Sequence, residues 1–161
     1  MNETALPPPK PSPAAHLQIR WMIRRDMLEV LAIESFCFLE PWSEEDFYRC
    51  LRQRNCIGMV AEHDQRISGF MIYELHRDRL QVLNFAVHPA CWRRRIGQGM
   101  ANKLKEKLVG GRRKHIALEI RESNLHAQLF FRAMGFQATE ILRDFYQNTN
   151  EDAYRFEFPA R

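Results

Sequence analysis

Residues 83–99 constrain the fold of this chain more than any other stretch. The segment opens with an apolar run typical of a buried strand. Pro89 ends that run, and three arginines lead to Gly97 and Gly99, where an amphipathic helical pattern begins. Free backbone N–H groups and the positive end of the helix dipole meet at such a turn, which makes it an anion site. Because arginines beside these amides suit a diphosphate, the segment predicts a phosphorylated cofactor.

Two other interpretations of this basic turn stay open at the level of sequence. Such a turn is also typical of a solvated surface. The stretch from position 93 to position 114 contains nine basic residues and a single glutamate. A surface with such an excess of positive charge can bind nucleic acid. No aromatic-rich stacking motif accompanies it, so we expect no nucleic-acid partner. The GxGxxG spacing and the P-loop Lys-Ser pair are missing, which disfavours a dinucleotide fold and a nucleoside triphosphatase.

The composition is typical of a globular protein. The chain has 161 residues, enough for one domain with its own core, of which 45% are hydrophobic and 27% charged. No apolar stretch approaches the ~20 residues that cross a bilayer, and the N-terminal sequence does not resemble a signal peptide, so we expect no membrane partner and a cytoplasmic location. The cysteines form no CxxC pair and the histidines no HExxH motif, so no metal site is predicted.

Hydrophobic periodicity predicts one domain after a tail. Residues 1–16 hold five of the eight prolines and predict a disordered tail, with the domain at 17–161. Helices are expected at 26–36, at 43–51 behind a Ser43–Asp46 cap, from Gly97 to the pair at 110–111, and at 124–134. Strands are expected at 19–23, 56–63, 66–76, 80–87, 115–120, 137–142 and 153–158. The order β-α-α-β-β-β-α-β-α-β-β predicts an α/β or α+β sandwich, a mixed sheet with helices packed on it.

Four stretches in this order resemble the GNAT family of N-acetyltransferases, and within it the RimI type, the ribosomal-protein-alanine N-acetyltransferases. They are PWSE at 41–44, LNFAV at 83–87, LEIRESN at 118–124, and 128–136 with its final MGF. The resemblance extends from about residue 17 to the end of the chain. It implies the GNAT fold, with a mostly antiparallel mixed sheet flanked by helices, and acetyl-CoA as the cosubstrate without a metal.

The same resemblance implies which residues hold the cofactor. The strand residues Phe85, Ala86 and Val87 would bind the pantetheine arm through their backbone. The pyrophosphate would lie in the turn at 93–98, and Asn124 would also contact the cofactor. The turn residues are Arg93, Arg94, Arg95, Ile96, Gly97 and Gln98. Arg95 replaces a family glycine, and arginine disfavours a left-handed backbone.

Glu119 is the predicted catalytic base. It lies on the polar phase of an otherwise apolar strand, where an exposed edge or an ion pair with an arginine would also explain it. The resemblance implies that it accepts the proton of the incoming amine, directly or through a water. An N-terminal amine has a pKa near 8 and lysine one near 10.4, which favours the terminal amine by roughly 3 to 4 kcal/mol at neutral pH. Backbone N–H groups at 85–87 would polarise the thioester carbonyl.

The family's general-acid tyrosine is replaced by Phe131, which has no proton to donate. A thiol has a pKa near 8.5, so the thiolate can leave with help from solvent or from another group, for which Tyr146 is a candidate by residue type. Phe145 and Tyr146 match one wall of the peptide groove of related enzymes, and Trp42 matches the other. Glu40 replaces an apolar family residue and could hold the substrate ammonium. Each of these side chains also fits a role in packing or on the surface.

The sequence therefore predicts transfer of acetyl from acetyl-CoA to the N-terminal α-amine of a protein, with an N-terminal alanine of a ribosomal protein as the expected acceptor. Acetylation of a small amine or a lysine side chain is the first alternative. The second alternative is a protein that binds acetyl-CoA without turnover, because Arg95 and Phe131 both depart from the family pattern.

Overall fold

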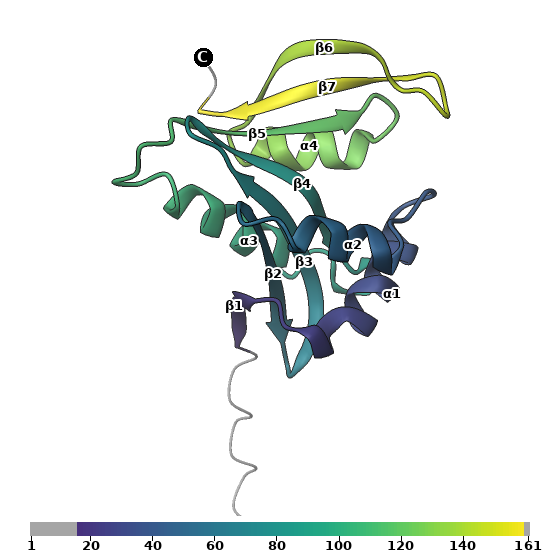
Figure 1. Ribbon diagram of the computed structural model, residues 1–161, viewed down its shortest axis with the longest axis vertical. Helices are drawn as coiled ribbons and strands as arrows, with labels where there is room; N and C mark the ends of the chain where they lie inside the picture. The colour runs from purple at the N-terminus through teal and green to yellow at the C-terminus, as the bar shows by residue number, and fades with distance from the viewer. Residues whose placement is uncertain (1–15, 160–161) are drawn as a thin grey trace, which may run out of the picture.

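A computed structural model describes residues 16–159. The predicted tail at 1–16 therefore lies, except for His16, outside the described residues. The described part forms seven strands and four α-helices in the predicted order (Figure 1). Their bounds are β1 Leu17–Trp21, α1 Met27–Cys37, α2 Glu44–Leu51, β2 Cys56–His63, β3 Arg66–Leu75, β4 Arg79–Val87, α3 Ile96–Glu106, β5 His115–Arg121, α4 Leu125–Ala133, β6 Gln137–Tyr146 and β7 Glu151–Phe158, with short 3₁₀ turns at Arg24–Asp26 and Pro89–Cys91.

The strands form one sheet in the order β1-β2-β3-β4-β5-β7-β6. Every neighbouring pair is antiparallel except β4 and β5, which run parallel because α3 connects them as a crossover. This confirms the predicted α+β class with a mixed, mostly antiparallel sheet. Residue 139 of β6 has no partner in β7, and the strand bulges there.

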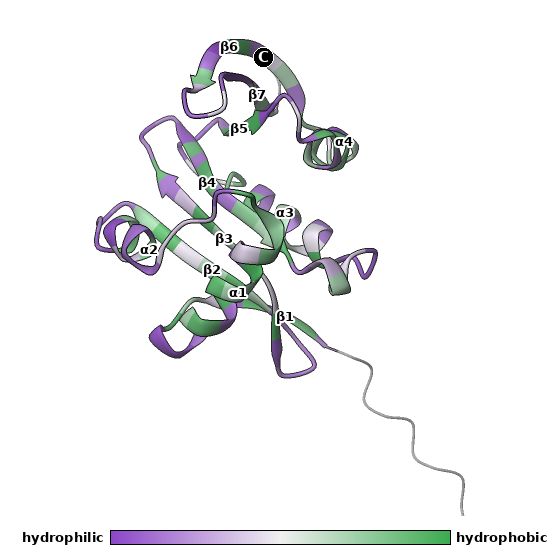
Figure 2. Cartoon of the chain, turned by 90° about the vertical axis from the view of Figure 1, so that its right-hand side faces the viewer, coloured by the Kyte–Doolittle hydropathy of each residue, from purple (hydrophilic) through white to green (hydrophobic). Residues whose placement is uncertain are grey.

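The sheet separates two apolar cores. Successive residues of β3 point to opposite faces, so Phe70 and Ile72 pack with α1 and α2 while Met71 and Tyr73 pack with α3. The two clusters cover both faces of strands β2 to β4, which read as long apolar runs for this reason. Figure 2 shows these apolar strands inside the molecule, between the helices.

Local chemistry explains where α2 begins. The predicted cap of α2 is present as a reciprocal pair, because Asp46 N–H donates to Ser43 Oγ at 3.2 Å and Ser43 N–H donates to Asp46 Oδ2 at 2.8 Å. The predicted end of α3 is wrong. The helix ends at Glu106, and the next residues form tight i→i−3 turns before Gly110, whose φ is +72°.

Candidate active site

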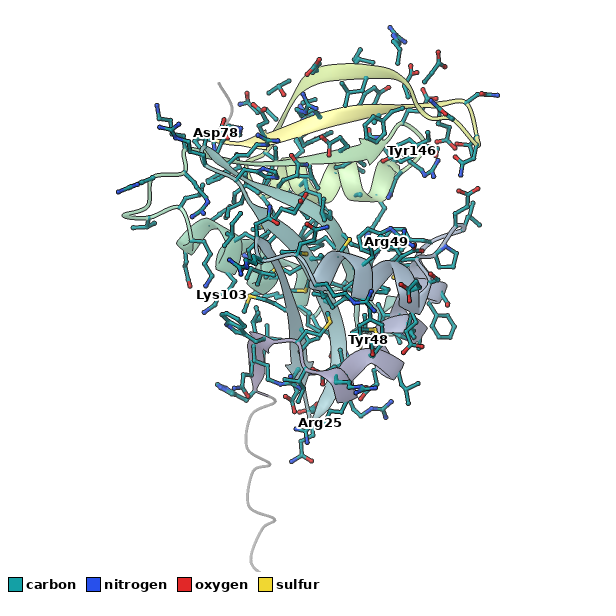
Figure 3. The ribbon with its side chains drawn as sticks, in the orientation of Figure 1. Arg25, Tyr48, Arg49, Asp78, Lys103 and Tyr146 are labelled. Atoms are coloured by element: carbon teal, nitrogen blue, oxygen red, sulfur yellow. The ribbon has the colours of Figure 1, made fainter. Side chains whose placement is uncertain are left out.

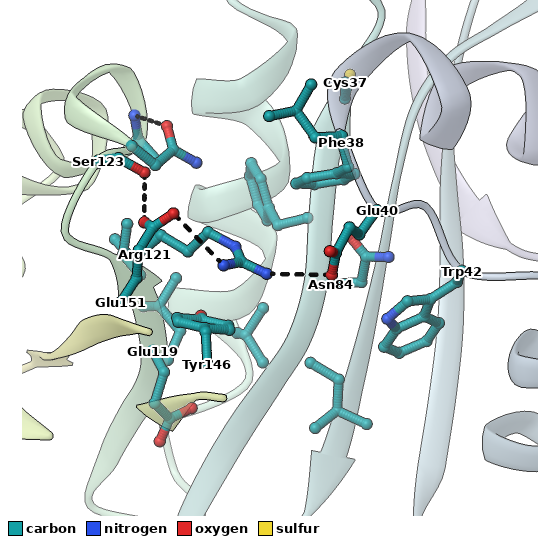
Figure 4. A pocket seen from close by; sticks show the side chains of 18 of the residues that line it. Cys37, Phe38, Glu40, Trp42, Asn84, Glu119, Arg121, Ser123, Tyr146 and Glu151 are labelled. Carbon is teal, nitrogen blue, oxygen red and sulfur yellow. Dashed lines mark hydrogen bonds and ion pairs between the residues drawn. The ribbon is translucent and has the colours of Figure 1, made fainter. Parts of the chain in front are cut away.

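The parallel strands β4 and β5 pair over three residues only, from Arg79 opposite His115 to Gln81 opposite Ala117. Beyond that point they diverge, as Figure 1 shows, and a cavity of about 640 Å³ opens between them. The α1–α2 loop, the first turn of α4 and the β6–β7 hairpin complete its walls (Figure 4). The divergence therefore creates a cavity where the two strands leave their polar backbone groups unpaired.

Backbone geometry decides which groups of β4 face this gap. His88 N–H donates to Ser68 O at 2.8 Å, so Val87 and its partner Gly69 form a non-hydrogen-bonded pair. The N–H and C=O of Val87, and by alternation those of Phe85, therefore point away from β3 and toward the gap. Ala86 has the opposite phase and pairs with Phe70 of β3. Of the three residues predicted on this strand, Phe85 and Val87 turn their backbone groups toward the gap and Ala86 does not.

The Val87 carbonyl is already in use. It accepts hydrogen bonds from the Trp92 indole Nε1 at 2.8 Å and from the Cys37 thiol at 3.3 Å. The Trp92 ring stacks on His126 of α4, with centroids 4.3 Å apart and planes 15° apart. Trp92 thus links the β4–α3 loop to α4 beside the end of β4.

The basic turn leads directly into α3. Arg95 is its N-cap residue, with φ +61°, and Arg93 also has a positive φ of +65°. Arg95 therefore occupies the left-handed backbone that arginine disfavours. All three arginine side chains are exposed, and the first N–H groups of α3 have no partner within the helix. Such a turn suits the diphosphate of acetyl-CoA.

Two residues of this turn, Ile96 and Gly97, are closely packed. Ile96 is buried, and Gln98 is exposed on the first turn of α3. A Cβ atom added at Gly97 would lie 3.1 Å from the ring of Phe130 on α4. Glycine at this position therefore lets the start of α3 approach α4 closely.

Glu119 lies on β5 and lines the cavity. Its Oε2 accepts from Gln81 Nε2 at 2.8 Å, and its Oε1 forms an ion pair with Arg155 at 3.3 Å. Arg155 also binds Glu140 of β6, at 2.6 Å. The ion pair that the sequence left open is therefore present, and the same carboxylate also faces the cavity.

Phe131 lines the cavity from α4 and is 3% exposed. Its ring meets those of Phe85, Phe130 and Phe136 edge to face, at centroid distances of 5.0 to 5.2 Å. Tyr146, at the end of β6, contributes a phenol to the cavity wall, and burial raises the pKa of that phenol. Figure 3 shows Tyr146 near the β6–β7 hairpin.

A charged group closes the end of the cavity beside the β6–β7 hairpin. The Arg121 guanidinium lies 3.8 Å from the centre of the Tyr146 ring and 3.8 Å from carboxylate oxygens of both Glu40 and Glu151 (Figure 4). Asn148 donates a further hydrogen bond to Glu40. Glu40 is thus paired with groups of the chain itself.

The remaining predicted residues differ in placement. Trp42 lines the cavity and packs edge-on against Phe47. Asn124 also lines it, and its Oδ1 accepts from Ala127 N–H at 3.1 Å, which caps α4. Phe145 is 48% exposed and lies outside the cavity lining.

Sequence reasoning missed two buried polar residues of the cavity, Glu34 on α1 and Asn84 on β4. Asn84 Nδ2 donates to Glu34 Oε2 at 2.8 Å, and Trp42 N–H donates to Glu34 Oε1 at 2.9 Å. Burial raises the pKa of Glu34, while the two hydrogen bonds oppose that change. A signal existed, because Glu34 stands on the apolar face of a predicted helix next to Ile33.

Within residues 16–159, no group of three or more histidine, cysteine, aspartate or glutamate residues is arranged to hold a metal ion. No helix of the described part is long and apolar enough to span a membrane.

Comparisons with known proteins agree with this geometry. The sequence profile of the Acetyltransferase (GNAT) family matches residues 27–136. A putative [ribosomal protein bS18]-alanine N-acetyltransferase of Bacillus subtilis is 27% identical over 136 residues, covering 84% of this chain and 90% of the relative. The [ribosomal protein bS18]-alanine N-acetyltransferase of Salmonella typhimurium is 28% identical over 136 residues, with 83% and 91% covered.

Solved structures support the fold. The ribosomal-protein-S18-alanine N-acetyltransferase from Escherichia coli superposes with a TM-score of 0.74 at 23% identity, covering 88% of this chain and 92% of that one. Ard1 from Thermoplasma volcanium gives a TM-score of 0.79 at 22% identity, with 88% and 95% covered. The chain belongs to the GNAT family of acetyl-CoA-dependent acetyltransferases and is homologous to its RimI-type members.

Proposed function

We propose that this acetyltransferase modifies the N-terminal α-amine of a protein, with an N-terminal alanine of a ribosomal protein as the preferred acceptor. The observation that carries the proposal is the single cavity that brings the free backbone groups of Phe85 together with the carboxylate of Glu119. The names of the bS18-alanine relatives support the acceptor, and a ribosomal acceptor would place the reaction in the cytoplasm.

The donor side would be held mainly by backbone groups. Phe85 and Val87 would bind the pantetheine arm, and the α3 amides with the arginine turn would bind the diphosphate. Bound acetyl-CoA supplies the acetyl group as a thioester. The N–H groups of β4 that point into the gap would polarise its carbonyl. When the pantetheine arm binds, one of its N–H groups would replace the Trp92 indole as a donor to the Val87 carbonyl.

The acceptor side would be governed by charge. Glu119 would take the proton of the incoming ammonium, directly or through a water, while Gln81 and Arg155 hold its carboxylate in one orientation. An α-amine needs less help than a lysine, because its pKa is about two units lower. The thiolate would leave with solvent assistance or with the proton of the Tyr146 phenol, since Phe131 offers none.

A panel of acceptor peptides tests the proposal. Mass spectrometry would follow acetylation of peptides beginning with Ala, Ser, Met or Gly, beside a lysine-containing peptide with a blocked N-terminus. The proposal predicts acetylation of the Ala α-amine well ahead of the blocked lysine peptide. Acetylation of the lysine or of a polyamine alone would replace the proposed acceptor with a side-chain or small amine. Acetyl-CoA binding without any product would indicate a binding protein.

A further inference from the structure

Glu34 joins two walls of the cavity. Its side chain belongs to α1 and the residue is 1% exposed. One carboxylate oxygen accepts from the backbone N–H of Trp42, in the loop that forms the acceptor wall, and the other accepts from Asn84 of β4. One buried carboxylate thus ties the acceptor wall to the strand expected to hold the thioester.

The contact on β4 lies at a particular point of that strand. Ile72 of β3 pairs with Asn84 and the next residue, Tyr73, pairs with Val82, so Leu83 is left without a partner in a β-bulge. A bulge bends its strand and redirects the residues after it. Asn84 is the first residue after the bulge. Glu34 therefore holds β4 where it turns toward the gap.

Helix α1 holds the other end of the same segment as well. The Cys37 thiol, one helical turn after Glu34, donates to the Val87 carbonyl at 3.3 Å. The segment between Asn84 and Val87 is thus fixed to α1 at both ends. This segment carries the backbone groups of Phe85 that face the cavity.

The electrostatics of Glu34 are unusual for a packing residue. Among residues 16–159 it forms hydrogen bonds with Trp42 and Asn84 and no ion pair with a lysine, arginine or histidine. A buried carboxylate is costly without such a partner, and an apolar side chain would normally fill the position better. Unlike an apolar side chain, the carboxylate accepts two hydrogen bonds, one from the Trp42 wall and one from Asn84 of β4.

We propose that Glu34 is a positioning residue for acetyl transfer, which fixes the Trp42 wall against the β4 segment after the bulge. It sets the distance between the acceptor amine and the thioester without touching either reacting group. The inference rests on acetyl transfer in this cavity, but not on which amine is the acceptor.

Three variants test the role of Glu34. Glu34→Ala removes both bonds, and we expect kcat to fall by about 100-fold, because small misplacements of reacting groups cost rates of this size. The Kd of acetyl-CoA, measured by calorimetry, should change little, since the arginine turn is untouched. Glu34→Gln should retain most of the wild-type kcat. Its carbonyl can accept from Trp42 N–H and its amide can donate to Asn84 Oδ1 once the Asn84 amide turns over.

Asn84→Ala gives an independent measure. It removes one of the two bonds and should lower kcat less than Glu34→Ala. The double variant should be no slower than Glu34→Ala alone, because Glu34→Ala already removes the one bond that Asn84 makes to Glu34. Asp26→Asn is the matched control. Asp26 is 3% exposed and paired with Arg20 at 2.8 Å, outside the cavity lining, so its loss should lower Tm with little effect on kcat.

The alternatives give different results. If Glu34→Gln loses as much kcat as Glu34→Ala while both remain folded by thermal unfolding, the negative charge itself takes part in the reaction and the positioning role is overturned. Unchanged kcat in Glu34→Ala overturns it as well. If Glu34→Ala does not fold, the Glu34→Gln and Asn84→Ala values decide the question. An enzyme that prefers a lysine or small amine contradicts the proposed acceptor, and the same ratios can then be measured with that amine.

Discussion

The two sides of the cleft use different parts of the chain. The proposed donor side offers backbone groups, namely the N–H and C=O of Phe85, the N–H of Val87 and the first amides of α3. The proposed acceptor side offers charged side chains of the α1–α2 loop, β5 and β7, and Arg121 links the carboxylates of Glu40 and Glu151 at 3.8 Å each. A backbone site tolerates substitution as long as the strand and helix keep their course, whereas a side-chain site changes with every residue. Side-chain substitutions should therefore change acetyl-CoA binding on the donor side little and change acceptor recognition on the acceptor side strongly.

The largest effect is expected at Glu119. Glu119→Gln keeps the shape and the bond from Gln81 but removes the base, so kcat should fall by about 10²- to 10⁴-fold with the Kd of acetyl-CoA little changed. Glu140→Gln is the matched control, because Glu140 shares Arg155 but is exposed and outside the cavity lining. Steady-state rates and calorimetry would compare the two variants. Equal loss in both would mean that Arg155, not Glu119, matters for the rate.

A smaller effect is expected at Arg121. Removing its guanidinium leaves Glu40 and Glu151 without their shared cation, and the acceptor end becomes more negative. In Arg121→Ala we expect kcat/KM for a peptide with lysine at its second position to rise about two- to fivefold relative to one with glutamate there. Added salt should reduce the difference.

Arg143→Ala serves as the control for this charge effect. Arg143 pairs with Asp152 on the same hairpin and lies outside the cavity lining. A similar change in peptide preference in both variants would show that net charge, rather than the position of Arg121, determines it.

The donor side can be probed at Arg95. Arg95→Gly relieves the left-handed strain of an arginine at φ +61°, whereas Arg94→Gly removes a similar side chain from a residue without positive φ. Arg95→Gly should exceed Arg94→Gly in free energy of unfolding by about 1–2 kcal/mol, as chemical denaturation would measure. The Kd of acetyl-CoA should differ little between the two. A large affinity loss specific to Arg95→Gly would mean that its side chain, not the backbone, binds the diphosphate.

The smallest effect concerns Cys37. Burial, with a further contribution from the charge of Glu34, raises the pKa of its thiol to about 11. Because only the thiolate reacts, alkylation by iodoacetamide at pH 8 should be slow and should accelerate as the pH rises toward 11. Peptide mass spectrometry would measure it. Fast alkylation at pH 8 in the folded protein would show that α1 leaves the end of β4 open.

Local sequence patterns predicted the order of helices and strands well. Features that depend on contacts between distant residues could not be predicted in this way. Alternating and helical periods gave the order of elements, and the Ser43–Asp46 cap is present as expected. The end of α3 was wrong because Gly110 ends the turns that follow the helix rather than the helix itself. These features depend on neighbours in the sequence, so the sequence alone carries most of the information.

The site was harder to predict than the fold, because it depends on contacts between residues that are far apart in the sequence. Glu119 and the β4 segment were recognised by motif, but the bond between Glu34 and Asn84 joins residues 50 positions apart. No period or spacing encodes such a pair. The bulge at Leu83 is equally invisible, because it depends on how β3 pairs with β4.

One measurement tests the central claim most directly. A single peptide with an N-terminal alanine and an internal lysine, both unblocked, would be incubated with acetyl-CoA and the enzyme at pH 7, and tandem mass spectrometry would locate the acetyl group. The account predicts acetylation at the alanine α-amine, lost in Glu119→Gln and kept in Glu140→Gln. Acetyl on the lysine, or an α-amine product that Glu119→Gln forms as fast as the wild type, would contradict it.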